Sequence, residues 1–391
     1  MSKALKKEYD AVVVGGGPAG LTFAHRTADR LSVLLLEENF EIGKPVQCSG
    51  LVSPRVIEMS GLKEWHNVIR AVEFLSPGGN TLSLKGDDPK GYVIDRSALD
   101  LHLAEAAGRT GAEMMLGASF TSAERMGDSL RISFSYRGET QFVETGLLVG
   151  ADGVSSAVGR RFGLTRFREI ISCIQTDAVS DGLEEGDAVR LYFGRDIAPG
   201  FFAWAIPAGG FVRIGLGISG GVMPANGYFE KLLNRLGIKR TLNVTAGPIP
   251  VGNRGRLAGD NVMIIGDAAG QVKPISGGGI FTGMAAGKLA AEVAIGALET
   301  GDTSRKYLSK YENRWRKGVG RELDRAALVR KIFLQMSDDK LDQLFGILDS
   351  SRLREVMSTG DIDFPTELSP LMLSREPALW RFSPQLIRAL I

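Results

Sequence analysis

The chain has 391 residues, enough for about two or three domains, and 44% of them are hydrophobic, enough for a large buried core. Its formal net charge is only +2, without the basic stripe that binding to nucleic acid usually needs. The two cysteines, Cys48 and Cys173, are far apart and the three histidines are isolated. The sequence therefore predicts no disulfide framework and no metal site, and favours a reducing, cytoplasmic setting.

The first forty residues predict a βαβ unit. Residues 9–14 (YDAVVV) and 31–38 (LSVLLLEE) are typical of buried strands, and residues 18–30 between them are typical of a helix. No secretory leader is expected, because the charged start runs directly into the first strand.

A G-x-G-x-x-G motif, Gly15, Gly17 and Gly20, lies at the turn between the first strand and the helix. In this motif the first glycine permits a sharp turn, the second a close approach of a pyrophosphate, and the third close packing of helix on sheet. Pro18 and Ala19 then open the helix, whose free N–H groups favour phosphates.

Two acidic residues, Glu37 and Glu38, end the second strand, where a carboxylate can accept hydrogen bonds from a ribose diol. A glycine turn beside an ordinary surface glutamate would be the alternative. With strand, helix and acid in register, the sequence predicts dinucleotide binding.

Later elements follow in chain order. Residues 97–108 predict a helix, with Ser97 as its N-cap and Gly108 as its stop. A hairpin is predicted from residue 129 to the strand that ends at the motif GADG. Residues 187–218 contain three strand-like runs separated by Gly and Pro, which indicates an antiparallel sheet.

Two further glycine-rich motifs occupy residues 150–163 (GADGVSSAVGRRFG) and 264–280 (IIGDAAGQVKPISGGGI). With the first motif, they resemble the flavoprotein family shared by p-hydroxybenzoate hydroxylase and the geranylgeranyl reductases. This resemblance implies that the first motif holds the ADP half of FAD, that Asp152 and Gly153 lie near the pyrophosphate, and that Gly266 and Asp267 hold the ribityl chain.

The third motif also has a physical interpretation of its own. Its glycines precede an apolar helix, so their N–H groups would lie at a positive helix end that stabilises negative charge on a reduced flavin. A flexible glycine loop is the alternative, and Asp267 just upstream favours the flavin site.

The resemblance narrows to the geranylgeranyl reductases through three segments: residues 44–53 (KPVQCSGLVS), 91–113, and 199–207 (PGFFAWAIP). The last is similar to the family signature Pro-x-x-Tyr-x-Trp-x-Phe-Pro, with Phe202 and Ile206 in place of Tyr and Phe. The resemblance covers about residues 8–320. It implies the following cofactor-binding residues: Gly15, Gly17, Pro18, Ala19, Gly20, Glu37, Glu38, Gln47, Cys48, Gly50, Arg96, Ala118, Asp152, Gly153, Gly266, Asp267, Gly278, Gly279 and Ile280.

Several of these residues have plainer alternatives. Cys48 lies in a Gly/Ser loop, which favours a functional role, although a free cysteine is often only a small hydrophobic residue. Arg96 is either a surface arginine or a neighbour of the flavin. The signature implies an isoprenoid-binding cavity lined by Tyr192, Phe202, Trp204 and Pro207, whereas aromatic residues on one strand face are more often core.

The fold class expected is α/β: a Rossmann-like FAD-binding domain with an inserted antiparallel-sheet substrate domain and a C-terminal helical extension. We assign residues 1–72, 96–164 and 255–325 to the first domain, 73–95 and 165–254 to the second, and 326–391 to the helical region.

The function implied is saturation of C=C bonds in the geranylgeranyl chains of archaeal ether lipids, with hydride from N5 of reduced FAD. Cys48 or an ordered water would donate the proton. An NAD(P)H-dependent aromatic hydroxylase and a non-catalytic FAD-containing lipid carrier are the alternatives. The partners expected are an isoprenoid lipid and an external electron donor, ferredoxin or NAD(P)H.

Two segments bear on the membrane. Residues 279–298 are apolar, but Lys288 and Glu292 interrupt them, which predicts a buried core helix and not a membrane span. The basic residues of 314–331 favour a solvated helix face, with attraction to anionic lipid as the alternative. A cytoplasmic protein, with possible peripheral contact at the inner membrane face, is therefore expected.

Overall fold

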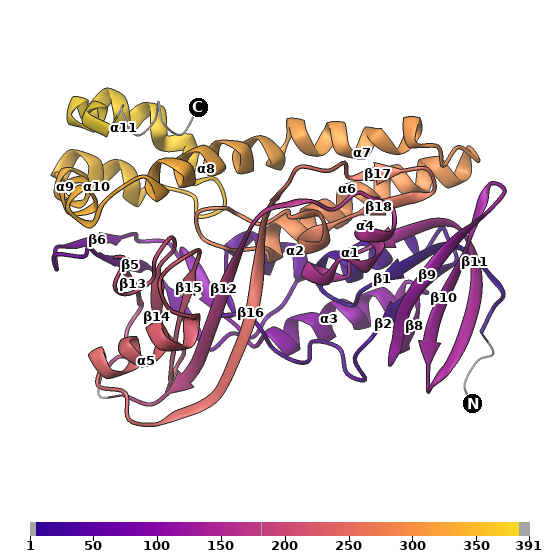
Figure 1. Ribbon diagram of the computed structural model, residues 1–391, viewed down its shortest axis with the longest axis horizontal. Coiled ribbons are helices and arrows are strands. Elements are labelled where there is room, and N and C mark those ends of the chain that lie inside the picture. The colour runs from indigo at the N-terminus through magenta and orange to yellow at the C-terminus, as the bar shows by residue number, and fades with distance from the viewer. Residues whose placement is uncertain (1–4, 181, 383–391) are drawn as a thin grey trace.

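The computed structural model describes residues 5–180 and 182–382. Figure 1 shows two lobes side by side, with long helices running across the top of both. Two long strands, β12 (Phe167–Ala178) and β16 (Thr241–Asn253), pair antiparallel and connect the lobes. The ends of the predicted domains at 1–4 and 383–391 lie outside the described residues.

The first lobe is built on an eight-stranded sheet whose centre is parallel, in the order β18-β11-β1-β2-β8. Valine and leucine runs form the central strands, because a parallel sheet covered on both faces buries the side chains at its centre, and Glu8 and Asp10 are exposed only at the start of the first strand. The βαβ unit and the hairpin are confirmed. The strands are β1 (Glu8–Val14), β2 (Val33–Glu37), β8 (Glu113–Leu116), β9 (Ala118–Met126), β10 (Ser129–Tyr136), β11 (Glu139–Gly150), β17 (Ala258–Gly259) and β18 (Val262–Ile264).

Helices cover this sheet. They are α1 (Pro18–Thr27), α2 (Pro54–Ser60), α3 (Arg96–Arg109), α4 (Ala157–Arg161), α6 (Ile280–Glu299) and α7 (Arg305–Lys317), with short 3-10 turns at Gly153–Ser155 and Gly266–Ala269. The predicted caps of α3 are wrong. Asp95 is its N-cap, because the carboxylate of Asp95 accepts the N–H of Ser97 at 2.8 Å, and Gly108 lies inside the helix.

Helix α6 is a buried core helix, as the sequence predicts. Within the described part of the chain it is the one helix long and apolar enough to cross a membrane, and 61% of its apolar window is buried. A Cβ atom on Gly287 would lie 2.5 Å from the carbonyl oxygen of Ala19 in α1. The glycine therefore allows α6 to pack closely against the helix that follows the first glycine turn.

The second lobe is a seven-stranded sheet in the order β16-β12-β15-β14-β13-β5-β6. The three predicted runs pair antiparallel with their neighbours, β13 with β14 and β14 with β15. Because β13 pairs parallel with β5, the sheet is mixed and not purely antiparallel. Helix α5 (Ala225–Arg235) covers one face. The further strands are β5 (Ala71–Leu75), β6 (Thr81–Lys85), β13 (Ala188–Tyr192), β14 (Ala203–Pro207) and β15 (Val212–Ile218). A small three-stranded sheet is formed by β3 (Leu51–Val52), β7 (Gly91–Val93) and β4 (Asn67–Ile69).

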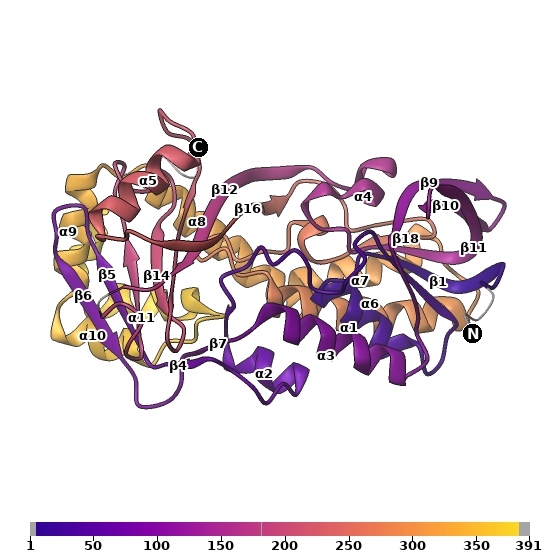
Figure 2. The same cartoon turned by 90° about the horizontal axis from the view of Figure 1, so that it is seen from below.

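The C-terminal region is helical, as the sequence predicts, within the described residues. It consists of α8 (Val319–Leu334), α9 (Asp338–Leu348), α10 (Ser351–Ser358) and α11 (Ser369–Arg375), with 3-10 turns at Pro365–Leu368 and Pro377–Phe382. These helices return over the second lobe (Figure 2). There the ring of Phe345 packs 5.4 Å from that of Phe193, which joins segments far apart in the chain.

Candidate functional site

A cavity of about 840 Å³ lies between the two lobes. Its lining comes from the glycine-rich turns of the first lobe, from the sheet of the second lobe, and from the C-terminal segment 357–372. It therefore brings together most of the residues that the sequence marks as cofactor or substrate ligands.

The first glycine turn has the backbone geometry that the motif predicts. Gly15 has a φ of +109°, and a Cβ there would lie 2.2 Å from the carbonyl oxygen of Ala151. A Cβ on Gly20 would lie 2.2 Å from the carbonyl oxygen of Gly15. A Cβ on Gly17, in contrast, would meet no atom within 4 Å, so this side of the turn is open to a ligand.

The acidic residue after β2 supports the same turn. The carboxylate of Glu37 accepts the N–H of Gly16 at 2.7 Å and the N–H of Asn39 at 2.9 Å, while Glu38 is exposed. Ala118 is buried at the start of β9 and is not among the residues that line the cavity. Ribose binding by the glutamates and flavin contact by Ala118 stay predictions.

The second motif leaves a buried polar atom without a partner inside the protein. Oδ2 of Asp152 accepts the N–H of Val158 at 2.9 Å, but Oδ1 is buried and has no hydrogen bond. Burial raises the pKa of this carboxyl. Gly153 beside it has a φ of +62° and open space where a side chain would stand.

The third motif places a carboxylate beside the start of α6. A Cβ on Gly279 would lie 2.8 Å from Oδ1 of Asp267, so the glycine makes room for this side chain. Burial raises the pKa of Asp267, and the charge of Arg96 opposes that shift. Gly278, Gly279 and Ile280 line the cavity, and no side chain caps the N-terminus of α6, so its N–H groups can bind an anionic group.

Cys48 and Arg96 lie together in the cavity wall. The N–H of Gly50 approaches the sulfur of Cys48 at 3.4 Å. Burial lowers the pKa of Arg96, but the neighbouring Asp100 and Cys48 raise it above its ordinary value. Arg96 donates to the Asp100 carboxylate at 2.6 Å, while its Nε is buried without a partner.

Of two predicted cofactor ligands near Cys48, one lies at the cavity and the other does not. Gln47 is exposed and lines the cavity, whereas Gly50 does not line it. Gly50 has a φ of +70°, and a Cβ there would lie 2.4 Å from the carbonyl oxygen of Ile94. Backbone conformation and packing therefore explain the glycine at position 50 without a ligand.

An apolar wall faces these groups from β14. Phe202 and Trp204 line the cavity, and the ring of Phe202 stacks on Phe201 at 4.1 Å. Tyr192 and Pro207 do not line the cavity. Because side chains alternate along a strand, Tyr192 lies on the opposite face, in the core beneath α5. The structure therefore does not bring Tyr192 or Pro207 to the substrate cavity.

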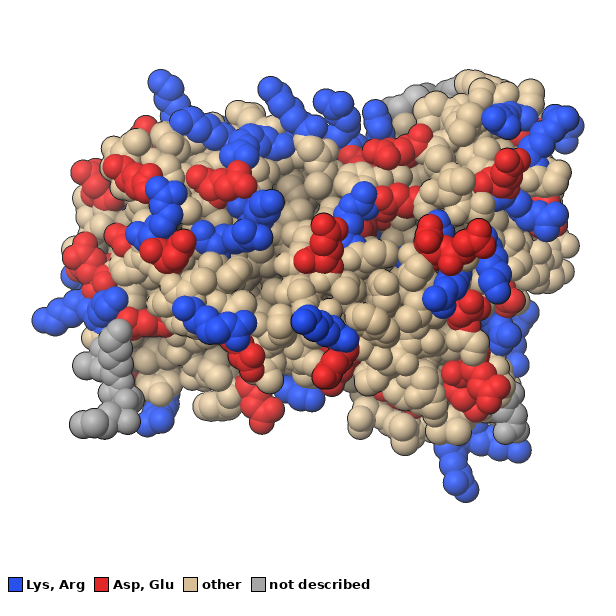
Figure 3. Space-filling view, turned by 180° about the vertical axis from the view of Figure 1, so that it is seen from behind, with Lys and Arg blue, Asp and Glu red and all other residues tan. Residues whose placement is uncertain are grey.

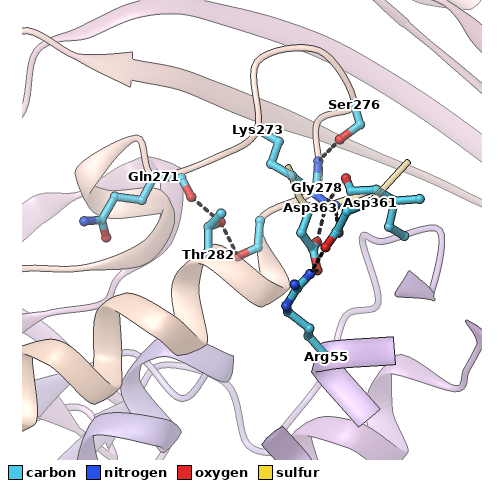
Figure 4. A network of polar contacts seen from close by, with 10 residues as sticks. Arg55, Gln271, Lys273, Ser276, Gly278, Thr282, Asp361 and Asp363 are labelled. Atoms are coloured by element: carbon cyan, nitrogen blue, oxygen red, sulfur yellow. Dashed lines mark hydrogen bonds and ion pairs between the residues drawn. The ribbon is translucent and has the colours of Figure 1, made fainter. Parts of the chain in front are cut away.

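Other residues at the cavity carry no signal in the sequence. Cys173 lines it from β12, and burial raises the pKa of its thiol to about 12, so it stays protonated. Lys273 and Asp363 form an ion pair of 2.8 Å between the flavin motif and the C-terminal segment (Figure 4). Each lies far from its partner in sequence, so no local spacing could have identified the pair.

The ion pair is part of a larger polar network around the start of α6. Arg55 of α2 pairs with Asp361 and lies 3.7 Å from Asp363, and its guanidinium stacks over the ring of Phe364 at 5.0 Å. Asp361 raises the pKa of Arg55. The network, which we call the clasp (Arg55, Lys273, Asp361 and Asp363), fastens the C-terminal segment to the first lobe (Figure 4).

The basic run 314–331 is only partly a solvated face. Arg314 pairs with Glu292 at 2.5 Å and Arg316 with Glu312 at 2.8 Å on the surface. Arg330, in contrast, is buried and donates to Glu169 at 2.6 Å. Figure 3 shows acidic and basic side chains interspersed over one face of the molecule, without a continuous basic stripe.

These residues fit FAD. The open side of Gly17, the unpartnered Oδ1 of Asp152 and the uncapped start of α6 are places where a phosphate, a hydroxyl and an anionic ring edge could bind. Asp267 and Arg96 also line the cavity, where they could hold the ribityl chain and the ring.

Comparison with proteins of known sequence identifies the relatives of this chain. No family model matches the chain. The chain is 37% identical to digeranylgeranylglycerophospholipid reductase 2 of Methanothermobacter thermautotrophicus over 89% of this chain and 94% of that protein. It is 33% identical to the digeranylgeranylglycerophospholipid reductase of Methanocaldococcus jannaschii over 89% and 93%.

Solved structures resemble the fold. A geranylgeranyl bacteriochlorophyll reductase-like protein from Thermoplasma acidophilum matches with a TM-score of 0.83 and 26% identity over 93% of this chain and 99% of that one. A flavin-dependent brominase matches with a TM-score of 0.72 and 19% identity over 97% and 100%, which shows the fold alone.

Proposed function

Because the chain belongs to the digeranylgeranylglycerophospholipid reductase family, an FAD-dependent oxidoreductase family, we propose that it saturates C=C bonds in the geranylgeranyl chains of archaeal ether phospholipids. The observation that carries the proposal is the 840 Å³ cavity. It joins the flavin motifs to an apolar wall of aromatic and aliphatic side chains, as an isoprenoid substrate requires.

FAD, once bound and reduced, supplies a hydride to one alkene carbon, and the other carbon must receive a proton. The apolar wall around Phe202 and Trp204 holds the chain and excludes water. Asp267 and the glycines at the start of α6, which also line the cavity, would hold the cofactor.

Cys48 is the proton donor in this proposal. Cys48 lines the cavity, so a bound alkene can come close to it. When the S–H bond breaks and the C–H bond forms, the thiolate left behind lies beside the Arg96 guanidinium, which stabilises its charge. Water then returns a proton to the sulfur.

Electrons must come from outside the chain, and we propose ferredoxin or NAD(P)H as their source. The lipid substrate implies work at the cytoplasmic face of a membrane, with peripheral contact. The described residues include one helix long enough to span a membrane, and that helix is core.

The test is a single turnover with the Cys48 variants. Dithionite-reduced protein is mixed with a geranylgeranyl phospholipid, and mass spectrometry follows the gain of two hydrogens per bond. We expect Cys48→Ala to bind FAD normally and to slow alkene reduction roughly a hundredfold, as for a lost proton-transfer group, and Cys48→Ser to lose less.

Three outcomes would contradict the proposal. Unchanged reoxidation of the flavin by substrate in Cys48→Ala would remove the role of Cys48. No mass gain with the parent protein would remove the reductase function. Oxygen uptake with phenols would point to a hydroxylase.

A further inference from the structure

The acidic side chains that line the cavity lie in one part of it, and three basic side chains line another. The acidic ones are Asp267, Asp361 and Asp363, all beside the flavin motifs or the clasp. Away from them, where the small three-stranded sheet meets the second lobe, the lining carries Arg70, Lys85 and Lys90. The cavity thus has a basic rim that the reduction chemistry does not use.

The backbone brings these three cations together. Lys85 ends β6 opposite Ala71, the residue after Arg70. The N–H of Gly86 donates to the carbonyl of Arg70 at 2.9 Å, and the N–H of Lys90 donates to the carbonyl of Ile69 at 2.8 Å. Segment 69–71 and the loop from Lys85 to Lys90 therefore meet at one edge.

The side chain of Lys90 lies across this edge. A Cβ on Gly86 would lie 2.5 Å from Cε and 3.4 Å from Nζ of Lys90. Since the φ of Gly86 is not positive, space and not backbone strain explains the glycine. The absence of a side chain at Gly86 therefore lets the Lys90 side chain lie against Gly86, the residue that follows Lys85.

Two of the cations have no anionic partner within residues 5–180 and 182–382. Arg70 and Lys90 are half-buried, and no ion pair or side-chain hydrogen bond involves either of them in that part of the chain. Lys85 is 70% exposed and reaches Asp187 only at 3.8 Å. The neighbouring Asp87 and Asp88 are exposed and do not line the cavity.

This arrangement contrasts with the cations near the flavin motifs. There Arg96 pairs with Asp100, Lys273 with Asp363, and Arg55 with Asp361. A cation that no protein anion neutralises keeps its charge available for a ligand that brings an anion. The rim also borders an apolar wall, which includes Val72, Phe74 and Leu84.

We propose that Arg70, Lys85 and Lys90 bind the phosphate group at the polar end of the isoprenoid substrate. The inference rests on the proposed function and extends it from the reacting chain to the headgroup. Arginine can bind two phosphate oxygens at once, and the lysines supply point charges beside it. The bound phosphate would stay at the rim while the apolar chain extends along the wall toward Cys48.

The test compares a charged and an uncharged ligand on the oxidised holoenzyme. The ligands are a geranylgeranyl phospholipid, geranylgeranyl diphosphate and the uncharged alcohol geranylgeraniol. Binding is followed by protein fluorescence, and dithionite-driven reduction gives KM and kcat. The variants are Arg70→Gln/Lys90→Gln and the matched control Lys63→Gln, an exposed lysine that does not line the cavity.

We expect the double variant to bind both phosphate ligands at least about tenfold more weakly, as for lost charge-assisted hydrogen bonds, with kcat nearly unchanged. Its affinity for geranylgeraniol should equal that of the parent. Salt should weaken phosphate binding to the parent more than to the variant. If the double variant loses more affinity for the phospholipid than for the diphosphate, the rim binds the lipid headgroup; the opposite order indicates a free diphosphate.

Three results would overturn the inference: unchanged phosphate binding in the double variant, an equal loss for geranylgeraniol, or an equal loss in Lys63→Gln. If the double variant fails to fold, Lys90→Gln alone should show the loss and Lys90→Arg should restore binding. Binding is measured without turnover, so a parent that reduces none of the ligands refutes the reductase function and leaves the rim testable.

Discussion

The two sides of the cavity are built in different ways. On the flavin side, short contiguous motifs place glycines and a few carboxylates where backbone geometry itself makes the site. On the substrate side, ordinary apolar side chains from β3, β5, β13, β14, β16 and the C-terminal segment make a surface together. We expect single substitutions in the glycine motifs to cause large losses of stability or FAD binding, and single substitutions among the apolar side chains to cause smaller losses.

The largest effect should come from a glycine that the fold itself needs. In Gly15→Ala the new Cβ would lie 2.2 Å from the Ala151 oxygen at a φ of +109°. We expect a loss of about 1–3 kcal/mol from backbone strain, and as much again from overpacking, in the free energy of unfolding. Thermal unfolding of the FAD-free protein measures it.

Gly17→Ala is the matched control, because its Cβ would meet no protein atom within 4 Å. The free energy of unfolding should be nearly unchanged. FAD should bind about tenfold or more weakly, since the methyl group occupies the space that a phosphate needs. Equal destabilisation by the two substitutions would contradict the distinction between a folding glycine and a binding glycine.

The clasp should respond next. Lys273 is 12% exposed and Asp363 is fully buried, so Asp363→Asn leaves a buried ammonium without its anion. Breaking a buried pair costs about 3–5 kcal/mol. Asp349→Asn, which breaks the half-exposed pair with Arg354, should cost about 0–1 kcal/mol. Chemical denaturation gives both values, and similar losses would show that the clasp does not fasten the C-terminal segment.

Asp267 should make the stability of the FAD-free protein depend on pH. Burial raises its pKa, so between the unfolded and the folded pKa the native state binds more protons than the unfolded state. The free energy of unfolding of the FAD-free protein therefore falls as pH rises through that window. Asp267→Asn should remove this decline. Burial also raises the pKa values of Asp100 and Asp152, so the parent protein's pH dependence contains their contributions too. The difference in unfolding free energy between parent and variant contains the contribution of Asp267 alone.

The same substitution should weaken FAD binding. Each charge-assisted hydrogen bond from a ribityl hydroxyl to Asp267 is worth about 1.5–3 kcal/mol. Parent affinity should fall on acidification, as the carboxylate takes up a proton, and the Asn variant should show no such dependence. Retention of FAD by Asp267→Asn at the parent level would mean that this carboxylate does not bind the cofactor.

What the sequence could predict follows the same division. Gly15 and Gly20 are recognisable because they belong to one short motif of fixed spacing, although the close approach of Ala151 to Gly15 is seen only in the fold. Lys273 and Asp363 are not recognisable, because they lie 90 residues apart and meet only through the fold of the C-terminal segment. The two-residue spacing of Phe202 and Trp204 gave their shared face, but which face of the sheet borders the cavity depends on where α5 packs.

Tyr192 therefore provides the smallest and most specific test. The sequence assigns it to the substrate, whereas its ring lies beneath α5, and burial raises its pKa. Tyr192→Phe should change the free energy of unfolding by at most about 1 kcal/mol, since only a hydroxyl is lost. Reduction of long isoprenoid chains should be unaffected.

Trp204→Ala, on the opposite face of the same sheet, is the contrasting variant. Removal of a buried indole costs about 3–5 kcal/mol in a core, and part of that loss should appear as poorer positioning of the chain. Turnover of long isoprenoids should then fall more than flavin reduction by dithionite, which needs no wall. If Tyr192→Phe lowers the turnover of long isoprenoids as Trp204→Ala does, then the face of the sheet that carries Tyr192 also contacts the substrate and is not only core.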